Sequence, residues 1–157
     1  PIRINFVYKI HHILIIKENI MENFPKELFT SKDVAGFEKY IIDNGIGKDD
    51  WLTTNHHTLL LYTLLYKKYK DYEMSKMLIK YFDINNQDRE GKTVLFHAVI
   101  MGNVPAIKFF VVNGGDVLIK DNAGRKAADY AAMLDIENSQ AISRMLLSEE
   151  NKAKKKA

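Results

Sequence analysis

Gly91-Lys92-Thr93 has the residue types found at the end of a phosphate-binding loop, and an apolar run follows it. In such a loop the backbone N–H groups wrap the phosphates of a nucleotide and the lysine reaches them. The motif also needs a glycine five positions before Gly91, and Asn86 stands there. Carboxylates at Asp88 and Glu90 would in addition repel phosphate charge. The spacing therefore argues against a nucleotide hydrolase and favours a turn followed by a helix cap.

Histidines and paired carboxylates elsewhere in the chain do not form a recognisable reactive site. The pairs His11-His12 and His56-His57 are adjacent residues, so their side chains diverge on a helix or a strand and cannot clamp a metal together. Asp49-Asp50 precedes Trp51 and is explained more simply by a turn or cap than by acid–base chemistry. His97 lies among apolar neighbours and is predicted to be a packed residue. We therefore expect no catalytic residue, no metal site and no cofactor.

Residues 66–73, YKKYKDYE, interleave aromatic and basic side chains, as proteins that bind single-stranded nucleic acid do. A solvated helix end and loop is the simpler explanation of the same run. The formal net charge is only +3, and part of the excess lies near the C-terminus in four lysines. These are Lys152, Lys154, Lys155 and Lys156. Binding of nucleic acid or an acidic surface through the run and this tail is therefore kept as the alternative function.

The composition describes a chain that can fold as one domain with a substantial core. Its 157 residues are 46% hydrophobic and 27% charged. The absence of cysteine excludes a disulfide framework, a thiolate metal site and a cysteine nucleophile. A chain without cysteine also fits a reducing compartment, so we expect a cytoplasmic protein.

The first 20 residues are apolar only in patches. Their longest uninterrupted apolar run, residues 13–16, is far shorter than the roughly 20 residues of a membrane span. No small-residue cleavage site of a signal peptide follows it. Lys17-Glu18 can be encoded by a purine-rich ribosome-binding sequence. On that hypothesis translation starts at Met21 of a bacterial gene, and residues 1–20 are an N-terminal extension.

Internal repeats organise the rest of the chain. Residues 88–103 align with residues 121–136 at an offset of 33, which pairs an Asp, a Gly and an Ala of one segment with the same types in the other. A second alignment, at an offset of 35, places Thr58 under Thr93 together with the apolar residues that follow each. The two additional residues are expected in the loop around residues 70–71.

Each repeat is predicted to contain two short helices, because its apolar residues recur at helical spacing. Leu95, Ala98 and Val99 are spaced i, i+3, i+4, and the same spacing recurs in the segments 107–111 and 74–82. These helices each have one apolar face. Such faces must pack against neighbouring repeats.

Capping residues mark where these helices begin and end. Thr93 suits an N-cap, and Gly102 suits the stop that ends the same helix. Asn113-Gly114 supplies a left-handed residue at the end of the following helix. Residues 30–33, TSKD, have the spacing of a capping box before a helix over 37–42, which is predicted to stop at residues 44–45.

The repeats resemble those of the ankyrin family, whose period is about 33 residues and whose signature is Thr-Pro-Leu-His-x-Ala. Residues 93–98, TVLFHA, keep the Thr, Leu and Ala of the signature, and residues 113–121, NGGDVLIKD, resemble the helix end and the finger that leads to the next repeat. Residues 124–131, GRKAADYA, resemble a variant with Asp129 at the histidine position. Val94 replaces the proline and Phe96 replaces the histidine. We expect Phe96 to fill with apolar contact the space where the family's histidine makes hydrogen bonds.

The resemblance implies an all-α ankyrin-type helix-turn-helix solenoid of about four stacked units. The repeat domain is expected over 21–150, and a basic tail over 151–157. The approximate units are 22–52, 53–87, 88–120 and 121–150.

The resemblance also implies a non-enzymatic module, expected to be a monomer, that binds another protein through its concave face. Apolar residues that align at the end of each first helix predict an exposed strip along that face, with finger residues beside it. The strip comprises Leu65, Tyr66, Ile100, Met101, Met133 and Leu134; the finger residues are Arg89, Glu90, Lys92, Asn122 and Arg125.

Overall fold

The computed structural model describes residues 27, 33–47, 58–65, 72–133 and 138–156. Over these residues the chain is helical and contains no strand. The helices are α3 (Val34–Asp43), α4 (Leu59–Leu65), α5 (Glu73–Leu78), α6 (Val94–Ile100), α7 (Val104–Val112), α8 (Ala127–Met133) and α9 (Ser139–Lys156).

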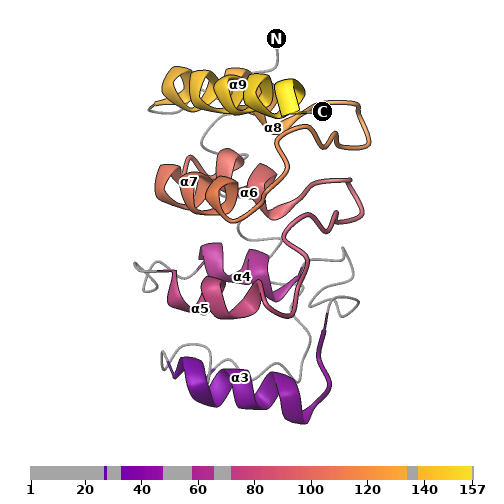
Figure 1. Ribbon diagram of the computed structural model, residues 1–157, viewed down its shortest axis with the longest axis vertical. Helices are drawn as coiled ribbons and strands as arrows, with labels where there is room; N and C mark the ends of the chain where they lie inside the picture. The colour runs from indigo at the N-terminus through magenta and orange to yellow at the C-terminus, as the bar shows by residue number, and fades with distance from the viewer. Residues whose placement is uncertain (1–26, 28–32, 48–57, 66–71, 134–137, 157) are drawn as a thin grey trace.

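The helices are stacked in layers, with α3 at one end and the pair α8 and α9 at the other (Figure 1). Helices α4 and α5 form one layer, and α6 and α7 form the next. Contacts between α4 and α6 and between α6 and α8 join successive layers, and α5 also contacts α3. Long loops between the layers project to the right in Figure 1. The predicted solenoid of helix pairs is confirmed.

The hydrophobic core runs through the whole stack, and α6 lies at its centre. All seven residues of α6 are buried, because α4, α7 and α8 pack around it. The core extends from Phe37 in α3 to Leu146 in α9, and both side chains are fully buried. A single helix pair could not bury its apolar face alone, so the layers stabilise one another.

Two predicted helix ends are confirmed. Helix α6 is followed by Gly102 with φ 63°, and α7 by Gly114 with φ 97°. Both values lie in the left-handed region, which glycine adopts without the steric cost of a Cβ. Helix α3 likewise ends at Asp43, one residue before the predicted stop.

The helix starts differ from the prediction in two places. The N-cap of α3 is Asp33, whose Oδ1 accepts the N–H of Gly36 at 2.8 Å, and Thr30 lies outside the described residues. Thr93 occupies the N-cap position of α6, but its side chain makes no capping hydrogen bond. The Thr93 Oγ1 is instead buried without a hydrogen-bond partner among the described residues.

Helix α9 has 18 residues, twice the nine of α7. It continues without a break through residues 151–156, which the sequence assigned to a separate tail. An ion pair between Lys126, just before α8, and Glu150 of α9 fixes the two elements together. Glu150 is 2% exposed and is the last fully buried residue of the helix.

Candidate partner-binding face

The loop ahead of α6 is a tight finger built on Asp88. Its Oδ1 accepts the backbone N–H groups of Glu90 and Lys92, each at 2.9 Å. Gly91 turns the chain at the fingertip with φ 78°. The second carboxylate oxygen, Oδ2, lies 2.8 Å from Nε2 of His97. One carboxylate therefore shapes the finger and attaches it to α6.

The loop ahead of α8 repeats this arrangement 33 residues further along the chain. Oδ1 of Asp121 accepts the backbone N–H groups of Ala123 and Arg125 at 2.9 and 2.8 Å. Its Oδ2 accepts the hydroxyl of Tyr130, on α8, at 2.7 Å and the Nε–H of Arg125 at 3.2 Å. Tyr130 thus has the role at the second finger that His97 has at the first.

The electrostatics of the second finger favour an ionised aspartate and a neutral tyrosine. Burial opposes ionisation of Asp121, but hydrogen bonds from Arg125 and Tyr130 and the Arg125 charge outweigh it and hold the Asp121 pKa below its usual value. Burial, followed by the Asp121 carboxylate, raises the pKa of Tyr130 to about 12. The hydroxyl of Tyr130 therefore stays a hydrogen-bond donor at neutral pH.

The ring of Tyr130 joins the two fingers. It packs edge-to-face against Phe96, with centroids 5.7 Å apart. The Lys92 Nζ of the first finger lies 5.4 Å from the ring centroid, and the Arg125 Cζ of the second lies 4.7 Å away. Both distances suit cation–π attraction. One aromatic ring thus contacts cations from two successive repeats.

Backbone groups also link the two fingers into a continuous edge. The Asn122 N–H donates to the Glu90 carbonyl at 3.0 Å, and its Nδ2 donates to the Arg89 carbonyl at 2.8 Å. At the base of the same loops, which is also exposed, Gln87 Nε2 donates to the Lys120 carbonyl at 3.0 Å. The positions of the fingertips are therefore set before any partner binds.

Four of the predicted finger residues are accessible on this edge. Arg89, Glu90 and Asn122 are exposed, and the side chain of Arg125 is 40% exposed. Lys92 contradicts the prediction, because it is only 4% exposed. Its stem is covered beside the Tyr130 ring, and its Nζ pairs with Glu90. Lys92 therefore positions Glu90 and is not itself available for contact.

The predicted apolar strip is wrong at Ile100, which is 0% exposed. Ile100 ends the central helix α6, which neighbouring helices enclose. Met101 and Met133 are half-buried, so part of each side chain reaches solvent. The remaining strip positions, the Leu65 side chain, Tyr66 and Leu134, lie outside the described parts of the chain.

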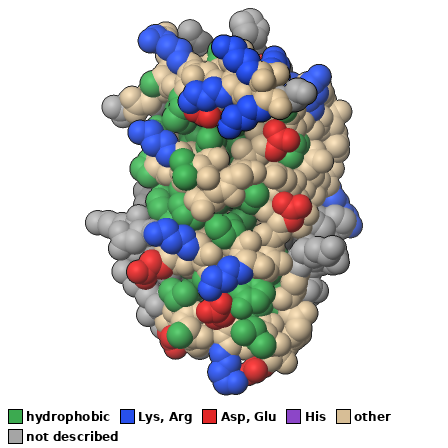
Figure 2. Space-filling view, viewed as in Figure 1, with side chains coloured by type: hydrophobic (Ala, Val, Ile, Leu, Met, Phe, Trp, Pro, Cys, Tyr) green, Lys and Arg blue, Asp and Glu red, His purple; other side chains and the backbone are tan. Residues whose placement is uncertain are grey.

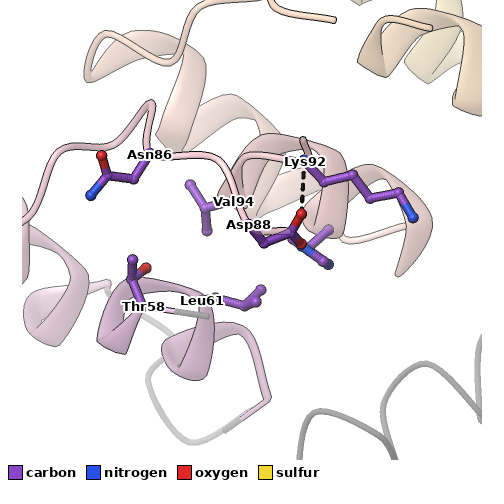
Figure 3. Close-up of a pocket in the computed structure, with 7 residues that line it drawn as sticks. Thr58, Leu61, Asn86, Asp88, Lys92 and Val94 are labelled. Carbon is purple, nitrogen blue, oxygen red and sulfur yellow. Dashed lines mark hydrogen bonds and ion pairs between the residues drawn. The ribbon is translucent and has the colours of Figure 1, made fainter. Parts of the chain in front are cut away.

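A small pocket lies between α4 and the first finger (Figure 3). Figure 3 shows Thr58, just before α4, and Leu61 of α4 on one side and the loop that carries Asn86 and Asp88 on the other. Its volume of about 10 Å³ suits one water molecule at most. The pocket therefore does not offer a small-molecule site.

Most of the other sequence features considered for chemistry lie outside the described residues. These are the two histidine pairs, the carboxylate pair 49–50 and residues 66–71 of the aromatic and basic run. Among the described residues, no group of three or more His, Cys, Asp or Glu side chains could hold a metal ion. The helices that the structure describes also include none long and apolar enough to cross a membrane.

Comparison with known proteins identifies the repeats. The family model for ankyrin repeats, in three copies, matches residues 61–157. The chain belongs to the ankyrin repeat family. It is also 32% identical, over 81 residues, to an ankyrin repeat protein of Acanthamoeba polyphaga mimivirus. That match covers 51% of this chain and 11% of the viral protein, so this ankyrin repeat chain corresponds to a small part of its relative.

Ankyrin repeats are generally protein–protein interaction modules. This ankyrin repeat protein departs from the family signature at Phe96, and the structure shows the consequence. The phenyl ring packs on Tyr130 of the next repeat, as the predicted apolar contact requires. The Thr93 hydroxyl is buried and has no hydrogen-bond partner within the described part of the chain. At this position the contact between these two repeats is therefore more aromatic and less polar than with the histidine of the family signature.

Tyr130 and the pairing of His97 with Asp88 were not identified as finger anchors from the sequence. The available signal was the repeat offset itself. Asp88 and His97 are nine residues apart, as are Asp121 and Tyr130, and each pair is 33 residues from the other. The aspartate of each finger and the side chain that it contacts therefore recur with the same spacing in both repeats.

Proposed function

We propose that this ankyrin repeat protein is a non-enzymatic module that binds another protein. The binding face is the edge of the two linked fingers together with the adjoining ends of α6 and α8. The observation that supports this proposal most directly is the combination of a fixed backbone with exposed side chains. Asp88 and Asp121 hold the two fingers, while Arg89 and Glu90 extend into solvent.

A fixed finger edge favours binding because little conformational entropy is lost when the partner docks. The hydrogen bonds from Asn122 to the backbone of Arg89 and Glu90 already hold the fingertips together. A partner therefore contacts side chains whose backbone does not have to be ordered first.

The chemistry of the exposed side chains suits a protein surface. Arg89 and Glu90 place opposite charges next to each other, and Asn122 adds an amide that can donate and accept hydrogen bonds. Arginine and methionine are enriched in protein interfaces, and the half-buried Met101 and Met133 add adaptable apolar contacts at the helix ends. An edge of mixed charge is poorly suited to the uniformly negative backbone of a nucleic acid.

Site-specific photo-crosslinking tests the location of the face. A photoreactive amino acid is introduced in place of Arg89, on the finger edge, or in place of Lys108, which is exposed on α7. Both proteins are irradiated in extracts of the native source, and the adducts are identified by mass spectrometry. We expect a discrete protein adduct from position 89 and none of that mass from position 108. The same adduct in equal yield from both positions would contradict the proposed face.

A further inference from the structure

Positive charge is concentrated at the end of α9. Lys154, Lys155 and Lys156 are all exposed, and none forms an ion pair with a described carboxylate. Their three charges equal the formal net charge of the whole chain, +3. Figure 2 shows Lys and Arg side chains gathered at the α9 end of the stack. Three exposed positive charges thus lie together in the last described turn of α9.

The two carboxylates of α9 pair with other cations. Glu150 pairs with Lys126, and Glu149 pairs with Lys152 at 2.7 Å. Neither carboxylate is therefore available to neutralise the last three lysines. The dipole of α9 favours cations in its last turn, but this stabilisation leaves the ammonium groups facing solvent.

The end of α9 is helical without being needed to pack the core. The last fully buried residue is Glu150, and after it only Ala153 is partly buried. Over the described residues the lysines therefore extend from the helix into solvent.

We propose that residues 151–156 form a second docking surface, which binds an extended acidic segment of a protein partner. Charge complementarity requires an anionic partner, and the placement of the lysines favours an extended chain. Lys154, Lys155 and Lys156 are consecutive, so they point to different sides of a helix with 3.6 residues per turn. A flexible Asp- and Glu-rich segment can wrap around such a helical turn, whereas a flat surface reaches only part of it.

Nucleic acid fits this surface less well. Helix α9 contains no aromatic residue on which a base could stack. Its last turn offers lysine ammonium groups, which act as point charges and lack the bidentate geometry with which arginine recognises phosphate. The surface also lies outside the finger edge, so the proposal stands whether or not that edge binds a partner.

Fluorescence anisotropy of a labelled poly-glutamate peptide, titrated with the full chain, tests this proposal. We expect binding at low salt that weakens at moderate salt, because exposed charges are screened. Replacing Lys154, Lys155 and Lys156 together by Gln should weaken binding on the order of tenfold, since each exposed charge contributes modestly. Glutamine has similar helix propensity, so the melting temperature should change little.

A matched control removes the same charge elsewhere. Lys76, Lys108 and Lys120 are exposed on α5, on α7 and between the repeats, and none forms an ion pair with a described carboxylate. Replacing these three together by Gln lowers the net charge equally and should leave peptide binding within about twofold of wild type, because the docking charges remain. Equal losses in the two triple variants would show general attraction to net charge and overturn the assignment.

Two further results would also overturn the proposal. One is the absence of peptide binding at low salt. The other is tighter binding of a DNA strand of the same charge than of the peptide, which would assign the surface to nucleic acid. If the Gln variant melts early, replacing the same three lysines by Arg keeps the charge. That Arg variant must then bind the peptide as the wild type does, and its failure would contradict a charge-based site.

Discussion

Replacing Tyr130 by Phe tests whether the second finger is anchored as the structure indicates. The change removes the hydroxyl that donates to Asp121 at 2.7 Å and leaves the ring packed on Phe96. A hydrogen bond to a charged group contributes about 1.5–3 kcal/mol. Asp121 keeps its bonds to Arg125, so we expect the lower figure, about 1.5 kcal/mol. The melting temperature should then fall by roughly 3–6 °C.

The same pair predicts how this difference depends on pH. The pKa of Tyr130 is raised from 10.0 to about 12, because the folded state favours the protonated hydroxyl. Its stabilisation is therefore fully present below pH 10 and is lost as the pH rises through about 12. The stability advantage of wild type over Tyr130→Phe should be constant at neutral pH and shrink in that window. Other groups that titrate there are common to both proteins and cancel in the comparison.

Urea unfolding followed by circular dichroism, at neutral pH and above pH 10, measures both effects. Tyr81→Phe is the matched control, since the Tyr81 hydroxyl also donates to a carboxylate, Glu38, at 2.9 Å, but this pair is only partly buried. We expect a smaller loss of stability for Tyr81→Phe than for Tyr130→Phe. Unfolding of Tyr130→Phe at the same urea concentration as wild type would refute the anchoring role of the hydroxyl.

Burial and backbone geometry give two more predictions. Ile100→Ala should lower the free energy of unfolding by about 2–5 kcal/mol, because the side chain is fully buried, and the half-buried Met101→Ala should cost less; urea unfolding ranks the two. Gly91→Ala should destabilise more than Gly114→Ala. Both glycines have positive φ, but a Cβ at Gly91 would lie 2.7 Å from the backbone nitrogen of Asn122, whereas one at Gly114 would meet nothing within 4 Å. Differential scanning calorimetry of the two Ala variants measures the contrast, and equal melting temperatures would contradict it.

The repeat architecture could be predicted from the sequence because its signals are local. Short segments suffice to recognise the helical spacing of apolar residues and the glycines after α6 and α7. Aligning two such segments then gives the 33-residue offset. The hydrogen bonding of the Thr93 side chain, in contrast, does not follow from such local signals. The backbone begins a helix after Thr93 as predicted. Phe96, however, stands where the family has a polar histidine, and no described residue hydrogen-bonds to the Thr93 hydroxyl.

The surface was harder to predict, because exposure depends on the neighbouring repeats. Ile100 is apolar and lies in a predicted helix, but the spacing of apolar residues does not show that the helices around α6 cover its side chain completely. The charge of Lys92 predicts an accessible side chain. In the structure, however, Tyr130 of the next repeat lies beside it and Glu90 pairs with its ammonium group. The side chain of Arg89 has no such contact with a described residue and stays exposed as predicted.

The most direct test of the proposed binding face compares partner affinity with stability in two variants of matched charge. Arg89→Ala removes an exposed finger side chain, and Lys108→Ala removes an exposed cation on α7. The affinity of each for the protein captured by crosslinking is measured by calorimetry, beside its melting temperature. We expect Arg89→Ala to bind at least tenfold more weakly, about 1.4 kcal/mol, at unchanged melting temperature, and Lys108→Ala to bind as wild type does. Wild-type affinity of Arg89→Ala, or an equal loss in both variants, would contradict binding through the finger edge.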